Sequence, residues 1–245
     1  MNILQVETGE RVQAMLHFRE TGDDQLYLFM TTRNGTVKRL EVSALKNLRN
    51  NGIRALTLDE GDELINVQET HGSDRILIAT HDGQAVCFDE TDVRAMGRTA
   101  VGVRGIRLRE GDYVVGAARA RAGRQVLSIT EKGYGKRTKI EEYPEHHRGG
   151  QGVYTITMTH KKGLLSVMKI VGPDDEIMIV SEDGVIVRTP VKGISELGRS
   201  TQGVKVMNVA DKDKVCAVAI ASTGKKKAKK AAPADENQMG LLEEE

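Results

Sequence analysis

A short stretch rich in arginine and glycine recurs along the chain at nearly constant intervals. Two copies are almost identical in sequence, Gly97–Arg104 (GRTAVGVR) and Gly198–Lys205 (GRSTQGVK). Weaker copies surround two further glycines. The pivot glycines of the four copies are therefore 50, 50 and 51 residues apart: Gly52, Gly102, Gly152 and Gly203. A period this regular indicates a repeat architecture with four units.

Each unit consists of short apolar strands separated by tight turns. The first turn carries a hydroxyl residue three positions before a glycine, and the strand that follows usually ends on basic residues. Asn34-Gly35, Asp82-Gly83 and Asp183-Gly184 are strong hairpin signals, because such turns need positive φ. Four short strands in roughly 50 residues are typical of a propeller blade, whereas no window keeps apolar residues at helical spacing. We therefore predict an all-β fold, a propeller-like ring of four-stranded blades.

The repeats divide the chain into one domain and a tail. The domain covers residues 1–221, with full repeats at about 24–70, 73–120, 123–170 and 174–221. Residues 1–20 align with the second half of a repeat, so we expect a partial N-terminal blade. Either the chain is part of a longer one, or the last repeat closes the gap. Residues 222–245 are rich in Lys, Ala and Glu, and we expect a disordered charged tail there.

The overall charge says little about partners. The sequence has 36 Lys and Arg against 35 Asp and Glu, a formal net charge of +1. The tail contains five lysines and five acids, so residues 1–221 keep the same net charge. Binding to a polyanion would therefore require basic and acidic residues to lie on different faces.

The cysteines and the apolar runs indicate in which cellular compartment the protein would lie. Cys87 and Cys216 both lie within apolar runs, and we interpret them as small buried hydrophobes of a reducing compartment rather than a disulfide pair. No apolar run approaches the roughly 20 residues of a membrane span. We expect a cytoplasmic protein without a membrane partner.

Basic residues recur at fixed distances from the pivot glycines. An arginine stands four residues before the pivot in three units, and a basic residue follows the pivot by two in three units. On superimposable blades these side chains would recur along one rim, where they could follow a bent phosphate backbone, and the glycines would let backbone N–H groups approach phosphates. Such contacts carry no base code, so binding should be non-sequence-specific. The predicted DNA-binding residues are Arg49, Arg54, Arg98, Arg104, Lys136, Arg137, Arg148, Arg199 and Lys205.

Other interpretations stay open at this point. The glycines could simply mark turns, and each arginine could pair with an acid on a solvated surface. A propeller could also serve as a protein-interaction scaffold. No nucleophile motif, Walker loop or Ser/His/Asp set occurs, and His146-His147 has no Cys or carboxylate at ligand spacing. We expect no catalytic residues and no metal site.

Over residues 1–221 the repeat resembles the C-terminal domain of the DNA gyrase A protein. The resemblance lies in Gly97–Leu108 and in Gly133-Tyr134-Gly135-Lys136-Arg137. It implies a β-pinwheel, in which neighbouring blades exchange a strand and a basic outer rim wraps DNA. The family's wrapping motif, Gln-Arg-Arg-Gly-Gly-Lys-Gly, belongs to the first blade, which we expect to precede this chain. Its nearest match here is the box-like motif, His147-Arg148-Gly149-Gly150-Gln151-Gly152.

The resemblance also implies a setting for the domain. The family's breakage–reunion domain is absent, so this part would bind double-stranded DNA without cleaving it. Its partners would be gyrase B and the rest of gyrase A, in an A2B2 heterotetramer. ATP and Mg²⁺ would act through other domains in ATP-dependent negative supercoiling, and this part would hold no cofactor. The enzyme would lie in the cytoplasm, at the nucleoid. The topoisomerase IV homologue is the alternative within the same fold.

Overall fold

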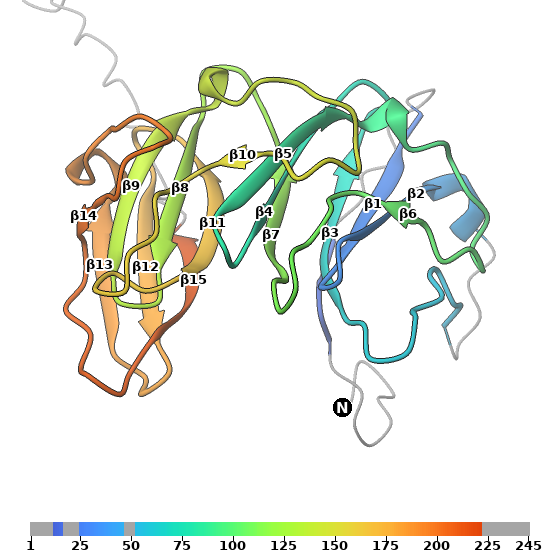
Figure 1. The fold of residues 1–245 in the computed structure, drawn as a ribbon. Coiled ribbons are helices and arrows are strands. Elements are labelled where there is room, and N and C mark those ends of the chain that lie inside the picture. Colours follow the sequence, from blue (N-terminus) through green and yellow to red (C-terminus); the bar gives the residue numbers. More distant parts are fainter. Residues whose placement is uncertain (1–11, 17–24, 47–51, 222–245) are drawn as a thin grey trace, which may run out of the picture.

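The computed structural model describes residues 12–16, 25–46 and 52–221. Four antiparallel sheets follow one another around a curved arrangement, from the sheet of β1 and β2 in blue to the sheet of β12 and β13 in orange (Figure 1). Short 3-10 turns follow the second strand of each sheet, at Val42–Leu45, Glu90–Asp92, Ile140–Glu142 and Val191–Gly193. The all-β, propeller-like fold predicted from the repeats is confirmed.

Each sheet, or blade, is built on a hairpin, and two residue types in the sequence determine the turn of that hairpin. The turn glycine has positive φ, for example 82° at Gly35. The hydroxyl three residues earlier accepts a backbone N–H across the turn, as Thr32 Oγ1 does from Thr36 N at 3.1 Å. The same bond recurs in the other three blades. The four hairpins are β1 (Tyr27–Thr32) with β2 (Thr36–Glu41), β4 (Arg75–Thr80) with β5 (Gln84–Asp89), β8 (Gln125–Thr130) with β9 (Tyr134–Lys139), and β12 (Glu176–Ser181) with β13 (Ile186–Pro190).

A third strand pairs with the first strand of each hairpin. These strands are β3 (Leu64–Thr70), β7 (Val114–Arg119), β11 (Leu165–Val171) and β15 (Val215–Ala221). Consecutive members of this set contact one another, so they form the hub of the arrangement. The second strand of each hairpin therefore lies toward the periphery.

The fourth strand of a blade belongs to the following repeat. β6 (Val103–Arg104) pairs with β2, β10 (Val153–Tyr154) pairs with β5, and β14 (Val204–Lys205) pairs with β9. We call these two-residue strands the exchanged strands. In the described residues blade 4 has three strands, β13-β12-β15. The exchange places the arginine- and glycine-rich stretch of one repeat on the outer edge of the blade before it.

The pivot glycines are required by this exchange. Gly102, Gly152 and Gly203 all have positive φ, and each immediately precedes an exchanged strand. A Cβ on Gly102 would stand 2.5 Å from the carbonyl oxygen of Val37, and one on Gly152 would overlap the carbonyl of Ala85. The glycines thus let two backbones approach closely within the protein.

Replacing Gly152 by alanine should destabilise the domain by about 2–4 kcal/mol. Alanine would have to adopt the left-handed φ of 75°, and its Cβ would collide with the carbonyl of Ala85. Urea unfolding followed by circular dichroism measures the loss. Gly150→Ala is the matched control two residues away. It should cost under about 1 kcal/mol, since no positive φ is recorded there and its nearest neighbouring atom is 3.9 Å from the added Cβ. Equal losses in the two variants would contradict this account.

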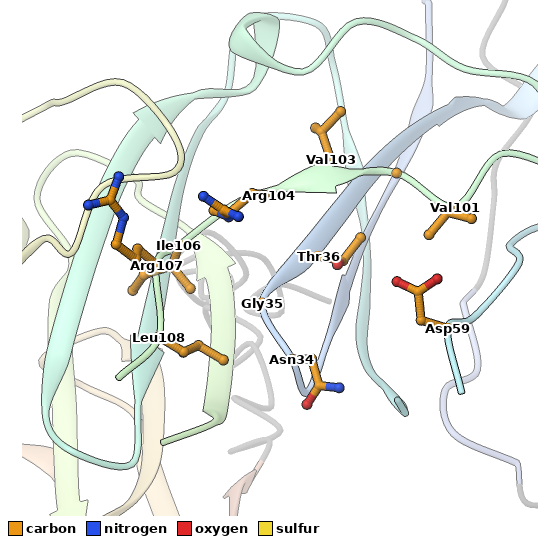
Figure 2. A pocket seen from close by; sticks show the side chains of 11 residues that line it. Asn34, Gly35, Thr36, Asp59, Val101, Val103, Arg104, Ile106, Arg107 and Leu108 are labelled. Atoms are coloured by element: carbon orange, nitrogen blue, oxygen red, sulfur yellow. The ribbon is translucent and has the colours of Figure 1, made fainter. Parts of the chain in front are cut away.

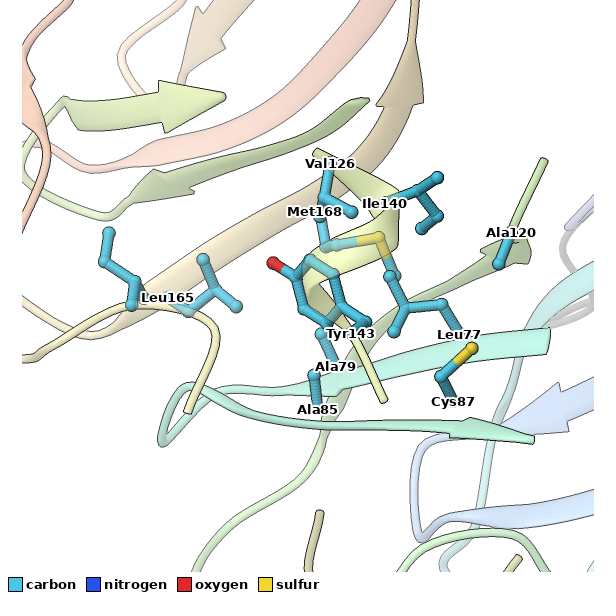
Figure 3. Close-up of a cluster of buried hydrophobic side chains, with 11 residues drawn as sticks. Leu77, Ala79, Ala85, Cys87, Ala120, Val126, Ile140, Tyr143, Leu165 and Met168 are labelled. Carbon is cyan, nitrogen blue, oxygen red and sulfur yellow. The ribbon is translucent and has the colours of Figure 1, made fainter. Parts of the chain in front are cut away.

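The hydrophobic core lies between blades rather than within them. Leu77 and Cys87 of blade 2 face Val126 and Met168 of blade 3, with Tyr143 fully buried among them (Figure 3). The next core has the same construction, since Leu127 and Ile129 of blade 3 pack with Ile177 and Ile179 of blade 4. Each blade is therefore stabilised by its neighbours, as expected of a repeat protein.

Some expectations are corrected or lie outside the described residues. Both cysteines are free, but only Cys87 is buried, and burial raises the pKa of its thiol to about 11. Cys216 is exposed on β15, so the prediction that it is buried was wrong. The tail at 222–245 and most of the partial blade at 1–20 are not described, although Leu16 packs against the blade 1 cluster. No helix in the described residues is long and apolar enough to cross a membrane.

Candidate nucleic-acid interface

The arginine- and glycine-rich stretches occupy equivalent positions on three blades. Seven residues before each pivot glycine, the chain forms a parallel bridge to the second strand of the preceding blade. These bridges are Arg39 with Ala95, Cys87 with Glu145, and Arg137 with Glu196. The chain then turns and returns as the exchanged strand. We call residues 95–104, 145–154 and 196–205 the rim loops, because they cover the outer edges of blades 1, 2 and 3.

The arginines four residues before the pivot lie at matching places on these loops. The Nη1 of Arg148 donates to the carbonyl of Arg104 at 3.1 Å, and the Nη1 of Arg199 donates to the carbonyl of Tyr154 at 3.0 Å. Each arginine thus reaches the exchanged strand of the preceding rim loop, two residues after its pivot glycine. The equivalence of these bonds places Arg148 and Arg199 along one rim.

These arginines are not locked onto acids. Arg98 is exposed, while Arg148 and Arg199 are partly buried. Among the residues that the structure describes, no carboxylate lies within ion-pair distance of the three guanidinium groups. Arg148 does make a further bond, from its Nε to the carbonyl of Asp92 at 2.9 Å. The carboxylates of Asp92 and Glu142 accept instead from the backbone N–H groups of Arg148 and Arg199, so the guanidinium groups form no direct ion pair with a described carboxylate.

The basic residues two positions after the pivot face solvent. Arg54, Arg104 and Lys205 are all exposed. Tyr154 takes this place in the third repeat and is 48% exposed, with the guanidinium of Arg109 at 5.8 Å from the centre of its ring. Exposed cations and one exposed aromatic therefore alternate with the arginines along the rim.

The structure places two predicted DNA-binding residues elsewhere. Lys136 is fully buried, and its ammonium donates to the rim loop that follows it. Arg137 is partly buried, with Nε bound to the carbonyl of Ile194 and Nη1 bound to Gln125 Oε1, both at 2.7 Å. Both cations bind groups of the protein itself, and their positions do not fit the predicted direct contacts with DNA phosphates. Arg49 lies outside the described residues.

The box-like motif forms the second rim loop. His147 is exposed and its Nδ1 stands 3.2 Å from Asp92 Oδ2. Gly149 has φ of 82° and donates its N–H to the carbonyl of Gly105 at 2.6 Å, while the carbonyl of Gly150 accepts from Arg107 N at 2.8 Å. Gln151 is exposed, and Gly152 is the pivot. Of the motif's side chains, His147 and Gln151 are exposed, whereas Arg148 is partly buried and its guanidinium binds two backbone carbonyls.

Two exposed arginines beside the rim were missed from the sequence. Arg107 and Arg109 follow the exchanged strand β6, and a groove of ≈ 610 Å³ separates Arg104 and Arg107 from Asp59 (Figure 2). Neither arginine recurs in the other repeats, so periodic positions do not reveal them. Their signal was local, three arginines in six residues. In the described part of the chain, no three His, Cys, Asp or Glu side chains converge as a metal site requires.

Comparison with known proteins matches nearly the whole described chain. Residues 26–70, 74–121, 124–161 and 175–222 match the family model "DNA gyrase C-terminal domain, beta-propeller". The DNA gyrase A protein of Haloquadratum walsbyi is 39% identical over 89% of this chain and 26% of that protein. The DNA gyrase A protein of Salmonella typhimurium is 42% identical over 88% of this chain and 24% of that protein. The chain thus spans about a quarter of the length of these relatives.

Solved structures show the same likeness. The C-terminal domain of DNA topoisomerase IV superimposes with a TM-score of 0.77 at 26% identity, covering 83% of this chain and 64% of that chain. The DNA gyrase A C-terminal domain superimposes with a TM-score of 0.72 at 29% identity, covering 82% of this chain and 68% of that chain.

Proposed function

Since the chain belongs to the DNA gyrase C-terminal domain family, we propose that it binds duplex DNA along the rim and bends it around the blades. The observation that carries the proposal is the recurrence, at one position of successive rim loops, of arginines whose guanidinium groups form no ion pair in the described residues. Equivalent cations at successive angles can follow a backbone that curves with the blades. Because these groups would meet phosphates rather than base edges, the binding is not sequence-specific, and any preference reflects how easily the DNA bends.

We propose further that this domain serves a gyrase A protein. The curated relatives at 39–42% identity support gyrase over topoisomerase IV, whose domain shares the fold. In that setting the domain would wrap DNA for ATP-dependent negative supercoiling, together with gyrase B and the rest of gyrase A. ATP and Mg²⁺ would be bound by those other parts, in the cytoplasm.

A salt titration tests DNA binding directly. A gel-shift titration on a linear duplex should give an affinity that falls steeply between 50 and 200 mM salt, by about 0.9 in log K per log unit of salt for each phosphate neutralised. Duplexes of different sequence but equal length should bind alike. Absence of a shift would favour a protein-interaction propeller, and an affinity independent of salt would exclude binding through the rim.

A further inference from the structure

Two lysines are fully buried at equivalent places in alternate blades. Lys38 on β2 and Lys136 on β9 each stand three residues after the turn glycine of their hairpin, and both side chains have 0% exposure. A buried ammonium is costly unless polar groups surround it. Both lysines must therefore have a compensating set of acceptors.

All the acceptors except the carbonyl of Ala55 come from the rim loops. The Nζ of Lys38 donates to the carbonyls of Arg98 at 2.7 Å, Ala100 at 2.9 Å and Ala55 at 2.8 Å. The Nζ of Lys136 donates to the carbonyls of Gly198 and Arg199, both at 2.5 Å, and to Thr201 Oγ1 at 3.1 Å. In both blades the ammonium thus binds the backbone of the arginine four residues before the pivot.

The lysine is not a requirement of the blade itself. Val86 of blade 2 and Val187 of blade 4 occupy the equivalent position. The rim loop over blade 2, which carries Arg148, has an additional bond from the Nε of Arg148 to the carbonyl of Asp92. The bond of Arg148 to the carbonyl of Arg104 is shared with the Arg199 loop, where Arg199 binds the carbonyl of Tyr154. A second contact also differs, because Thr57 and Thr157 bind the lysine-held loops through their hydroxyls, whereas Arg107 stands at that place under the Arg148 loop.

We propose that Lys38 and Lys136 are positioning residues for DNA binding, which fix the backbone of Arg98 and Arg199 so that these guanidinium groups meet phosphates. The inference rests on the proposed function. It replaces a direct phosphate contact of Lys136 with an indirect role and adds Lys38, which its position in the sequence did not reveal. It also predicts that only two of the three rim loops depend on a buried lysine.

Proton loss from Lys136 would weaken this hold. Burial lowers the pKa of Lys136 to about 8, with the Glu142 carboxylate opposing that shift and the Arg199 guanidinium adding to it. A neutral amine has two N–H donors and a lone pair, so it cannot donate to all three oxygens. Neighbouring Tyr143 does not titrate in this range, because burial raises the pKa of its hydroxyl to about 12.

Double substitutions test the coupling. Lys136→Met should lower the affinity for a linear duplex by up to roughly the tenfold loss expected for Arg199→Gln at 50 mM salt. In the Arg199→Gln background it should add less than about twofold, because the positioned group is already gone. Lys38→Met should couple in the same way to Arg98→Gln and act independently of Arg199→Gln. Lys132→Met, which removes an exposed charge from the turn of the same hairpin, is the control and should leave affinity unchanged.

Two further measurements separate positioning from general damage. Hydrogen exchange without DNA should show faster exchange of amides 198–203 in Lys136→Met, with amides 98–104 unaffected. Wild-type affinity should fall between pH 7 and 9, and the fall should be smaller in Lys136→Met, where only Lys38, whose pKa burial also lowers, can still lose its proton.

Each contrary outcome has a distinct meaning. Multiplicative losses in the double variants would overturn the proposal in favour of a direct phosphate contact. Unchanged exchange at residues 198–203 would overturn it independently of DNA. If the wild-type protein does not bind DNA, the proposed function fails, while the exchange experiment still decides whether the lysine holds the loop. If Lys136→Met does not fold, the Lys38 series gives the same test in blade 1.

Discussion

Replacing Arg98, Arg104 and Lys205 by glutamine should reduce the affinity for duplex DNA by about 10³-fold at 50 mM salt. Each lost phosphate contact costs on the order of tenfold at that salt concentration. The three side chains are exposed and lie on the rim loops over blades 1 and 3. The slope of log K against log salt should become shallower by about 2.7, at about 0.9 for each of the three contacts. Fluorescence anisotropy of a labelled duplex at four salt concentrations gives both quantities.

A variant of equal charge keeps this result interpretable. Lys132, Lys169 and Lys212 are also exposed, but they lie on turns and on a hub strand rather than on the rim loops. Their triple glutamine variant has the same net charge as the rim variant and should keep most of the affinity and the wild-type slope. If the two variants weaken binding equally, the effect comes from overall charge and the rim assignment is wrong.

Replacing Leu127 by alanine should destabilise the domain by about 2–5 kcal/mol. Leu127 is fully buried between blades 3 and 4, where it packs with residues such as Ile177 and Ile179. Truncation removes apolar surface and leaves a cavity, because the two sheets are held apart by the rest of the interface. Urea unfolding followed by circular dichroism should show a lower midpoint with an unchanged slope.

Blade 4 supplies the matched control for this prediction. Met178 occupies the same place in its hairpin, six residues before the turn glycine, but it is 36% exposed. In the described residues no further blade covers it. Met178→Ala should therefore change the free energy of unfolding by no more than about 0.5 kcal/mol. A large loss there would mean that the outer face of blade 4 is covered in solution.

The hairpins could be predicted from the sequence because their chemistry is local. A hydroxyl residue, a turn glycine and two apolar runs within a few residues determine each turn, and the regular period shows that the same solution recurs. The exchanged strands could not be found in this way. β6 is two residues long and pairs with β2, which lies more than sixty residues earlier in the chain. Neither the length of β6 nor the residues next to it in the sequence identify the strand with which it pairs. Only family likeness suggested an exchange.

The structure gives the pivot glycines a role that the sequence pattern does not reveal. Their period indicates a repeat architecture, and the sequence leaves two interpretations of the glycines open, backbone approach to phosphates and simple turn formation. In the structure their missing Cβ is required by a carbonyl of the preceding blade, as at Gly102 against Val37. Lys136 and Arg137 pose a related problem. Adjacent residues of a strand point their side chains to opposite faces of the sheet. This alternation indicates that Lys136 and Arg137 cannot both point their side chains to the same surface.

Strand exchange also determines how the rim would respond to mechanical load. DNA bound to a rim loop would pull on a segment that is hydrogen-bonded to the sheet before it and covalently continuous with the sheet after it, so each attachment would be anchored in two blades at once. Tension on one rim loop would be distributed over the neighbouring blades and would not act on a single sheet alone.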